Sequence, residues 1–280
     1  MDILTAQSAD GTTLTLRRWP ASGRPIAQVL LVHGLAEHHG RYEHVAAALN
    51  RAGFSATIVE LRGHGGSEGK RGHVDAWTQY EDDLRAAAAL MDGPFFIVAH
   101  SMGGLVTLSA LNSGLDAEIK GVAISNPLLG VAVEAPAIKL KAAGLLSKLL
   151  PRLPLSNELD VKTISRDPEV VRAYEQDPKV YSSITPRWFT ESQAAMARVH
   201  AAAGSYTVPL LMMVGTGDAI CAHQDAVRFH DAYGAADKEL KSYEGFFHEL
   251  FNEPEKEEVL EEVVGWLRRR DGDSTEMPIG

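Results

Sequence analysis

A serine at position 101 stands where an apolar, strand-like run meets a helical segment, which is the setting of a reactive serine. The apolar run covers residues 95–99, and the helical pattern begins at residue 105. The turn Gly-x-Ser-x-Gly needs small residues two positions before and after the serine, because the chain must bend sharply to expose the hydroxyl. Gly103 meets this need, and Ala99 takes the place of the first glycine. We therefore predict that Ser101 is a nucleophile, with a plain helix cap as the alternative.

An aspartate and a histidine follow in the chain order that this type of serine requires. Asp218 comes after the apolar run 210–214 and a Gly-Thr-Gly turn, and His248 lies on a loop before the C-terminal helix. A serine hydroxyl is a poor nucleophile until a base removes its proton, and a carboxylate fixes the tautomer of that base. The sequence thus predicts a catalytic triad of Ser101, His248 and Asp218. A turn aspartate and an ordinary surface or core histidine are the alternatives.

A histidine–glycine turn after the first apolar run is typical of a loop that binds an oxyanion. Enzymes with such a triad take one backbone N–H from this loop and another from the residue after the nucleophile. We expect the N–H groups of Leu35 and Met102 to fill these roles. A metal site is disfavoured, because the histidines at 33, 38, 39 and 44 lack the i, i+4 helical pair with an intervening glutamate. The predicted chemistry needs neither a metal nor another cofactor.

Helical patterns alternate with segments that have the composition of strands. Residues 12–19 alternate and are β-rich, as expected of a leading hairpin. Short apolar runs, typical of strands buried on both faces of a parallel sheet, cover residues 28–33, 55–61, 94–99 and 121–125, and residues 208–215 and 239–243 complete the set. Helices are expected at 43–52, at 77–91 and after Pro254. This alternation predicts an α/β fold with a mainly parallel sheet flanked by helices.

One stretch interrupts the alternation. Residues 127–190 contain no convincing buried strand, so we expect a helical cap inserted into a core domain of residues 1–126 and 191–270, followed by a flexible tail at 271–280. Within the cap, residues 135–150 predict a helix that ends at Pro151, and residues 167–177 predict a shorter one.

The first cap helix is apolar on one side and basic on the other. The residues that define the two sides are Ile138, Ala142, Leu145, Leu146, Leu149 and Leu150, and Lys139, Lys141 and Lys148. Such a helix packs its apolar face over the active site, or presents leucines to a lipid surface with lysines near anionic head groups, or does both.

The bulk composition excludes some partners. The formal net charge of -10 argues against nucleic acid, because that binding depends on lysines and arginines that neutralise phosphates. Cys221 is the only cysteine, so no internal disulfide can form, as is usual in a reducing compartment. The first ten residues lack the pattern of a secretory signal, and no run reaches the ~18 apolar residues of a membrane span. We expect a cytoplasmic protein, and the sequence leaves its oligomeric state open.

Five motifs together resemble the monoacylglycerol lipase and lysophospholipase group of the α/β hydrolases. They are His-Gly-x-x-Glu-His-x-Gly-Arg-Tyr at 33–42, Arg-Gly-His-Gly-x-Ser-x-Gly at 62–69, His-Ser-Met-Gly-Gly at 100–104, Gly-Asp-x-x-Cys at 217–221 and Tyr-Glu-Gly-x-x-His at 243–248. The first is the most specific, because generic hydrolases lack its Glu-His-x-Gly-Arg-Tyr extension. The chain departs from the group's pattern at Ala99 and in the cap. The resemblance implies the α/β-hydrolase fold, with a sheet of the eight-stranded type and a helical cap.

The resemblance also implies an activity and a substrate site. The implied reaction cleaves a monoacylglycerol to a fatty acid and glycerol through an acyl-enzyme, with lysophospholipid or short- and medium-chain ester hydrolysis as the alternative. Glu37, Arg41 and His100 match the residues that recognise glycerol hydroxyls. The cap matches the acyl channel and a surface that touches membrane transiently. An aminopeptidase is disfavoured, because the loop after His33 lacks an acidic cluster, and a non-catalytic scaffold is disfavoured because the triad is intact.

Overall fold

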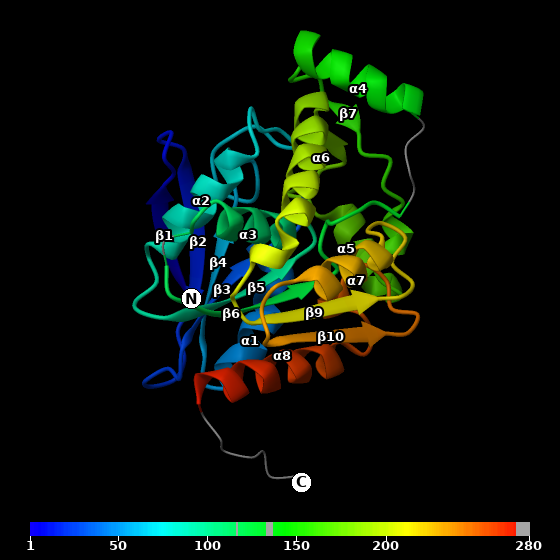
Figure 1. Cartoon of the computed structure of the whole chain (residues 1–280). Helices are drawn as coiled ribbons and strands as arrows, with labels where there is room; N and C mark the ends of the chain where they lie inside the picture. Colours follow the sequence, from blue (N-terminus) through cyan, green and yellow to red (C-terminus); the bar gives the residue numbers. More distant parts are fainter. Residues whose placement is uncertain (116, 133–136, 273–280) are drawn as a thin grey trace.

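An eight-stranded sheet runs through the centre of the computed structural model (Figure 1). Its strand order is β1-β2-β4-β3-β5-β6-β9-β10. β2 pairs antiparallel with β1 and β4, and the other neighbours pair parallel. The strands are β1 (Asp2–Gln7), β2 (Thr13–Trp19), β3 (Gln28–Val32), β4 (Ser55–Glu60), β5 (Phe95–His100), β6 (Ile119–Ser125), β9 (Leu210–Gly215) and β10 (Lys238–Tyr243). The predicted α/β fold with a mainly parallel sheet is confirmed.

The structure describes residues 1–115, 117–132 and 137–272, with the backbone alone at 137–141. Residues 135 and 136 of the predicted cap helix, the side chains of Ile138, Lys139 and Lys141, and the predicted tail from residue 273 onward lie outside the described residues. Within the described ranges, no helix is both long and apolar enough to cross a membrane.

Helices cover both faces of the sheet and enclose a separate hydrophobic core on each. α1 (Glu43–Arg51) and α8 (Lys256–Asp271) pack on one face. α2 (Thr78–Ala88), α3 (Met102–Asn112), α6 (Pro186–Ala201) and α7 (His223–Ala232) cover the other. Every residue of β5 and β9 is buried, because both of their faces contact helices. This explains why these strands have continuous apolar sequences.

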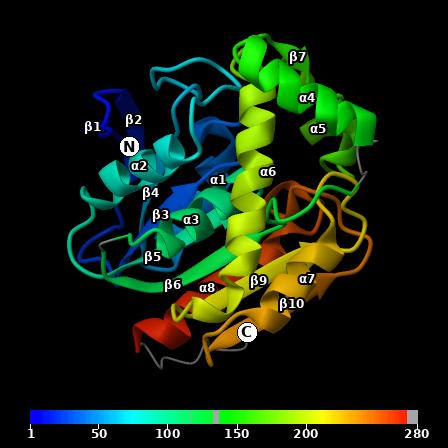
Figure 2. The ribbon, with the colours of Figure 1, turned by 45° about the horizontal axis from the view of Figure 1, so that its top comes forward.

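A helical insertion separates β6 from β9. It contains α4 (Ala137–Leu149), β7 (Leu155–Ser156), η2 (Val161–Thr163), α5 (Pro168–Gln176), β8 (Ser183–Ile184) and α6. β7 and β8 form a two-stranded ribbon that the sequence did not predict, since each has only two residues and neither is buried. α6 runs from the sheet layer up to α4, which lies farthest from the sheet (Figures 1 and 2). The cap boundary predicted at residue 190 therefore falls inside α6.

One interpretation of the sequence had the apolar side of α4 packed over the active site, and the structure differs. Leu145, Leu149 and Leu150 are 59%, 67% and 52% exposed. The expectation that this face packs over the active site is therefore wrong for these three leucines. The cause is the position of α4, which rests on the end of α6 instead of on the sheet (Figure 2).

Polar contacts join the insertion to the loops at the sheet edge. His38 Nε2 lies 2.7 Å from a carboxylate oxygen of Asp177. The Tyr181 hydroxyl lies 2.6 Å from His64 Nε2, and His73 Nδ1 lies 2.9 Å from the Thr185 hydroxyl. These contacts hold α5 and the ribbon against the loops that follow β3 and β4.

Candidate active site

Ser101 occupies a strained turn between β5 and α3. Its φ of 51° and ψ of −118° lie in a region that residues other than glycine rarely adopt. This conformation turns the side chain away from the line of the strand, as a nucleophile at such a turn requires. Its N–H donates to the Ser125 carbonyl at 3.0 Å, which ties the turn to β6. A Cβ atom on Gly103 would stand 2.4 Å from the Val32 carbonyl oxygen, so this position accepts only glycine. The sharp turn that the sequence predicts is therefore present.

The structure brings Ser101, His248 and Asp218 together in one hydrogen-bonded row. His248 Nε2 lies 2.9 Å from the Ser101 hydroxyl, and Nδ1 lies 2.7 Å from Oδ2 of Asp218. Oδ1 of the same aspartate accepts the N–H groups of Ile220 and Cys221 at 2.8 and 2.9 Å. These donors fix the carboxylate so that its free edge faces the imidazole.

Burial and the neighbouring groups act in opposite directions on the pKa values of Asp218 and His248. Burial acts to raise the pKa of Asp218, but the facing imidazole and the two N–H donors hold it below its ordinary value. Burial acts to lower the pKa of His248, but Asp218, with the more distant Glu249 and Glu37, raises it above its ordinary value. The imidazole is thus a stronger base than an isolated histidine.

A buried carboxylate anchors the loop after β3. Glu37 accepts the Gly34 N–H at 2.6 Å and the Tyr42 hydroxyl at 2.8 Å on one oxygen, and Arg41 Nε at 3.3 Å on the other. Leu35, one of the two predicted N–H donors, follows Gly34 in this loop. Leu35 lines the same cavity as Ser101, and so does Met102.

Arg41 links the buried carboxylates of Glu37 and Glu249 beside the Ser101–His248–Asp218 triad. Besides Glu37, it donates through Nη2 to Glu249, and its guanidinium lies 4.8 Å from the ring centre of Tyr174. Glu37 and Glu249 line the cavity, whereas Arg41 lies behind them. His100 also lines it, with its ring 4.7 Å from that of His248. Burial lowers the pKa of His100 to about 4, so it is neutral near pH 7.

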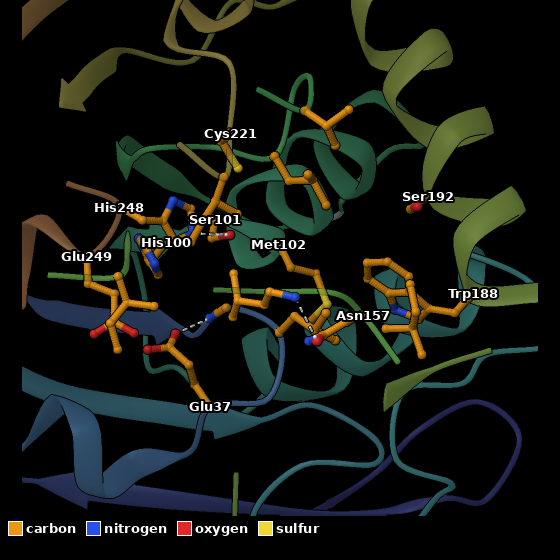
Figure 3. A pocket seen from close by; sticks show the side chains of 18 of the residues that line it. Glu37, His100, Ser101, Met102, Asn157, Trp188, Ser192, Cys221, His248 and Glu249 are labelled. Atoms are coloured by element: carbon orange, nitrogen blue, oxygen red, sulfur yellow. Dashed lines mark hydrogen bonds between the residues drawn. The ribbon is translucent and has the colours of Figure 1, made fainter. Parts of the chain in front are cut away.

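The cavity around Ser101 has a volume of about 220 Å³ and two chemically different sides. Figure 3 shows Glu37, Glu249 and His100 to one side of Ser101, and Trp188 and Ser192 on α6 to the other. The insertion supplies most of the apolar lining, which includes Ile184, Trp188, Phe189 and Met196. A single-chain ester with an apolar half and a polar half fits this division.

The sequence analysis did not single out two buried polar residues that the structure places beside Ser101 and His248. Asn126, at the end of β6, hydrogen-bonds the loop that carries His248. Glu249 follows His248 directly, but acidic residues are common near the C-terminal helix and nothing marks this one. A polar residue at the carboxyl end of a buried parallel strand was the signal available for Asn126, since ligands bind at that edge of such sheets.

Comparisons with known proteins agree with this geometry. The family model described as serine aminopeptidase, S33, matches residues 23–255. The chain is 32% identical to the monoacylglycerol lipase of Mycolicibacterium smegmatis over 92% of this chain and 93% of that one. It is 30% identical to phospholipase YtpA of Bacillus subtilis over 86% of this chain and 95% of that one. It is 34% identical to an uncharacterized abhydrolase domain-containing protein of Dictyostelium discoideum over 94% of this chain. That match spans only 28% of the length of the Dictyostelium protein.

A solved structure extends the likeness to three dimensions. The crystal structure of the Paleococcus ferrophilus monoacylglycerol lipase superposes with a TM-score of 0.85 at 31% identity, and the match covers 96% of this chain and all of that one. The chain therefore belongs to the serine aminopeptidase S33 family of the α/β hydrolases, within the group that contains the monoglyceride lipases.

Proposed function

We propose that the protein is a serine hydrolase that cleaves monoacylglycerols to a free fatty acid and glycerol. The observation that carries the proposal is the row of Ser101, His248 and Asp218, which opens into a cavity with an apolar side and a polar side. The names of the relatives from Mycolicibacterium and Paleococcus support the same substrate class.

In the proposed reaction, His248 takes the proton of Ser101 as the hydroxyl oxygen attacks the ester carbonyl. The N–H groups of Leu35 and Met102 stabilise the negative charge that develops on the carbonyl oxygen. The imidazolium then protonates the leaving alcohol, which departs and leaves an acyl-serine. Water attacks this acyl-enzyme with the same base, and the fatty acid is released. Asp218 keeps Nδ1 of the imidazole protonated and stabilises the imidazolium.

The polar side of the cavity suits a neutral alcohol. Glu37, Arg41 and His100 form this side in our proposal, with Arg41 acting from behind. Its positive charge is already matched by two carboxylates, so the side offers no free cation to a phosphate. Lysophospholipid hydrolysis is the second candidate, and the 30% identity to a Bacillus phospholipase favours it.

The insertion between β6 and β9, predicted as residues 127–190 and continued by α6 to Ala201, serves in this proposal as the cap over the rest of the chain. The cap encloses the acyl half of the substrate and limits the access of water. Its outer surface meets the lipid that supplies the substrate. Leu145, Leu149 and Leu150 are exposed there beside Lys148, a combination that suits the boundary between acyl chains and head groups.

Substitution of the nucleophile tests the proposal. Ser101→Ala should abolish labelling by a fluorophosphonate probe and the hydrolysis of 1-monoacylglycerol, since removal of a triad member costs several orders of magnitude in rate. Ser22→Ala, which removes an exposed hydroxyl, is the matched control. Full activity of Ser101→Ala would end the proposal. A wild-type kcat/KM that is higher on lysophospholipids than on monoacylglycerols of equal chain length would establish the second candidate instead.

A further inference from the structure

Glu249 places a second carboxyl group in the wall of the cavity, next to the base. It follows His248 directly in the chain, lines the same cavity as Ser101 and is only 4% exposed. In Figure 3 its side chain lies on the same side as Glu37, and both carboxyl groups bind Arg41. Its carboxyl group therefore borders the same cavity in which His248 must protonate the leaving alcohol.

One oxygen of Glu249 is bonded and the other is not. Oε2 accepts hydrogen bonds from Arg41 Nη2 and from Asn252 Nδ2, the latter at 2.9 Å. No described residue donates to Oε1. Both oxygens of Glu37, in contrast, accept hydrogen bonds from the protein. Glu249 therefore retains an acceptor that the protein itself leaves for a ligand.

The chemistry of this oxygen selects a hydroxyl group. Because Glu249 lines the cavity, a ligand that enters it can reach Oε1. A ligand that covered this oxygen without offering a donor would leave it unsatisfied at a cost, so a ligand O–H at this point is favoured. A phosphate diester offers only acceptors and would face a carboxyl group. Burial raises the pKa of Glu249, and the nearby Glu37 adds to the rise while Arg41 opposes it. A hydroxyl satisfies the group in either state, because it can donate to a carboxylate and accept from a carboxylic acid.

We propose that Glu249 binds a hydroxyl group of the leaving alcohol and is a specificity-determining residue for the alcohol half of the substrate. The inference rests on the proposed function, because it concerns the alcohol that the same triad releases. It adds to the polar side a residue with a free hydrogen-bonding atom, whereas Glu37 chiefly holds the loop after β3.

A comparison of two substrates isolates this role. A 1-monoacylglycerol and the methyl ester of the same fatty acid differ in the hydroxyls of the alcohol. The kcat/KM ratio of the first to the second should fall about tenfold in Glu249→Leu, since a hydrogen bond to a charged group contributes at least that much. Glu249→Gln should lower the ratio about threefold, because its amide still offers a hydrogen-bonding group to the cavity.

The control and the rate of probe labelling separate specificity from damage to the site. Glu244→Gln removes an exposed carboxylate from the turn before His248 and should leave the ratio at the wild-type value. The rate of fluorophosphonate labelling reports the reactivity of Ser101 in each variant, apart from any alcohol. A ratio in Glu249→Gln and Glu249→Leu equal to that of the wild type would overturn the inference. If Glu249→Leu fails to fold, the ratio in Glu249→Gln decides alone.

Failure of the proposed function has a different signature. It would appear in the wild-type enzyme, as hydrolysis of the methyl ester without hydrolysis of the monoacylglycerol. Failure of the inference would appear only in the variants, with the wild-type enzyme active on both esters.

Discussion

The side-chain amide of Asn126 donates a hydrogen bond of 2.7 Å to the backbone carbonyl of His248. The same nitrogen donates to the Phe247 carbonyl at 3.1 Å, and the amide oxygen accepts the Gly215 N–H at 2.8 Å. Asn126 itself adopts a φ of 40°, which asparagine tolerates better than most residues. It thereby ties the end of β9 to the loop that presents the imidazole, and it acts as a positioning residue.

The first prediction concerns this asparagine. Asn126→Ala leaves buried backbone groups without partners and should lower the free energy of unfolding by about 2 kcal/mol. The kcat/KM on every ester should also fall, since the His248 loop loses its tie to the sheet. Urea unfolding and p-nitrophenyl ester hydrolysis measure the two effects. Asn112→Ala, at an exposed position on α3, is the control. If both variants lose equal stability and activity, Asn126 does not position the loop.

The second prediction concerns the turn of the nucleophile. Gly103→Ala places a methyl group 2.4 Å from the Val32 carbonyl and 2.6 Å from that of His33, and neither backbone atom can move without shifting β3. We expect a large loss of stability and of fluorophosphonate labelling. Gly144→Ala adds the same methyl group to α4, where no atom apart from the neighbouring residues and the backbone of the same helix lies within 4 Å. It should instead stabilise the helix by about 0.5–1 kcal/mol. Thermal unfolding that ranks the two variants equally would contradict this argument.

The sequence predicted what depends on local pattern and chain order. The central strands were visible because burial on both faces forces continuous apolar runs. The triad was visible because Ser101 and Asp218 each follow such a run and His248 comes after them in the required chain order. The contacts of Glu249 and Asn126 were not visible. Both depend on groups that are more than 80 positions apart in the chain: Asn126 donates to the backbone carbonyl of His248, and Glu249 accepts from Arg41.

The insertion was the least predictable part. Its two-stranded ribbon is too short to leave a periodic pattern. The sequence analysis also missed α6, which packs against α3 near one end and against α4 near the other. The sequence left open which way the leucines of α4 point, because an apolar stripe does not specify whether it faces the core or a lipid surface.

The third prediction concerns pH. The base acts only when neutral, and the pKa of His248 is raised, so kcat/KM should fall as the pH drops through a value above the ordinary histidine pKa. Asp218→Asn removes the charge that raises this pKa. The acid limb should then move to lower pH, while the maximal rate falls about 10⁴-fold. Asp92→Asn, at an exposed position, should shift neither. An acid limb that stays in place in Asp218→Asn would mean that a different group titrates.

The fourth prediction concerns the outer face of the cap. Leu145 and Leu149 are 59% and 67% exposed, and transfer of both side chains from water into a lipid boundary contributes about 1 kcal/mol or more each. The double variant Leu145→Ser/Leu149→Ser should therefore bind vesicles of phosphatidylcholine and phosphatidylglycerol at least about tenfold more weakly in a sedimentation assay. Hydrolysis of a water-soluble ester should change by less than about twofold, as is usual for surface substitutions. Ile3→Ser, at a 63% exposed residue of β1 outside the insertion, controls for the loss of an apolar side chain. Equal vesicle binding by both variants would exclude this face as the lipid contact.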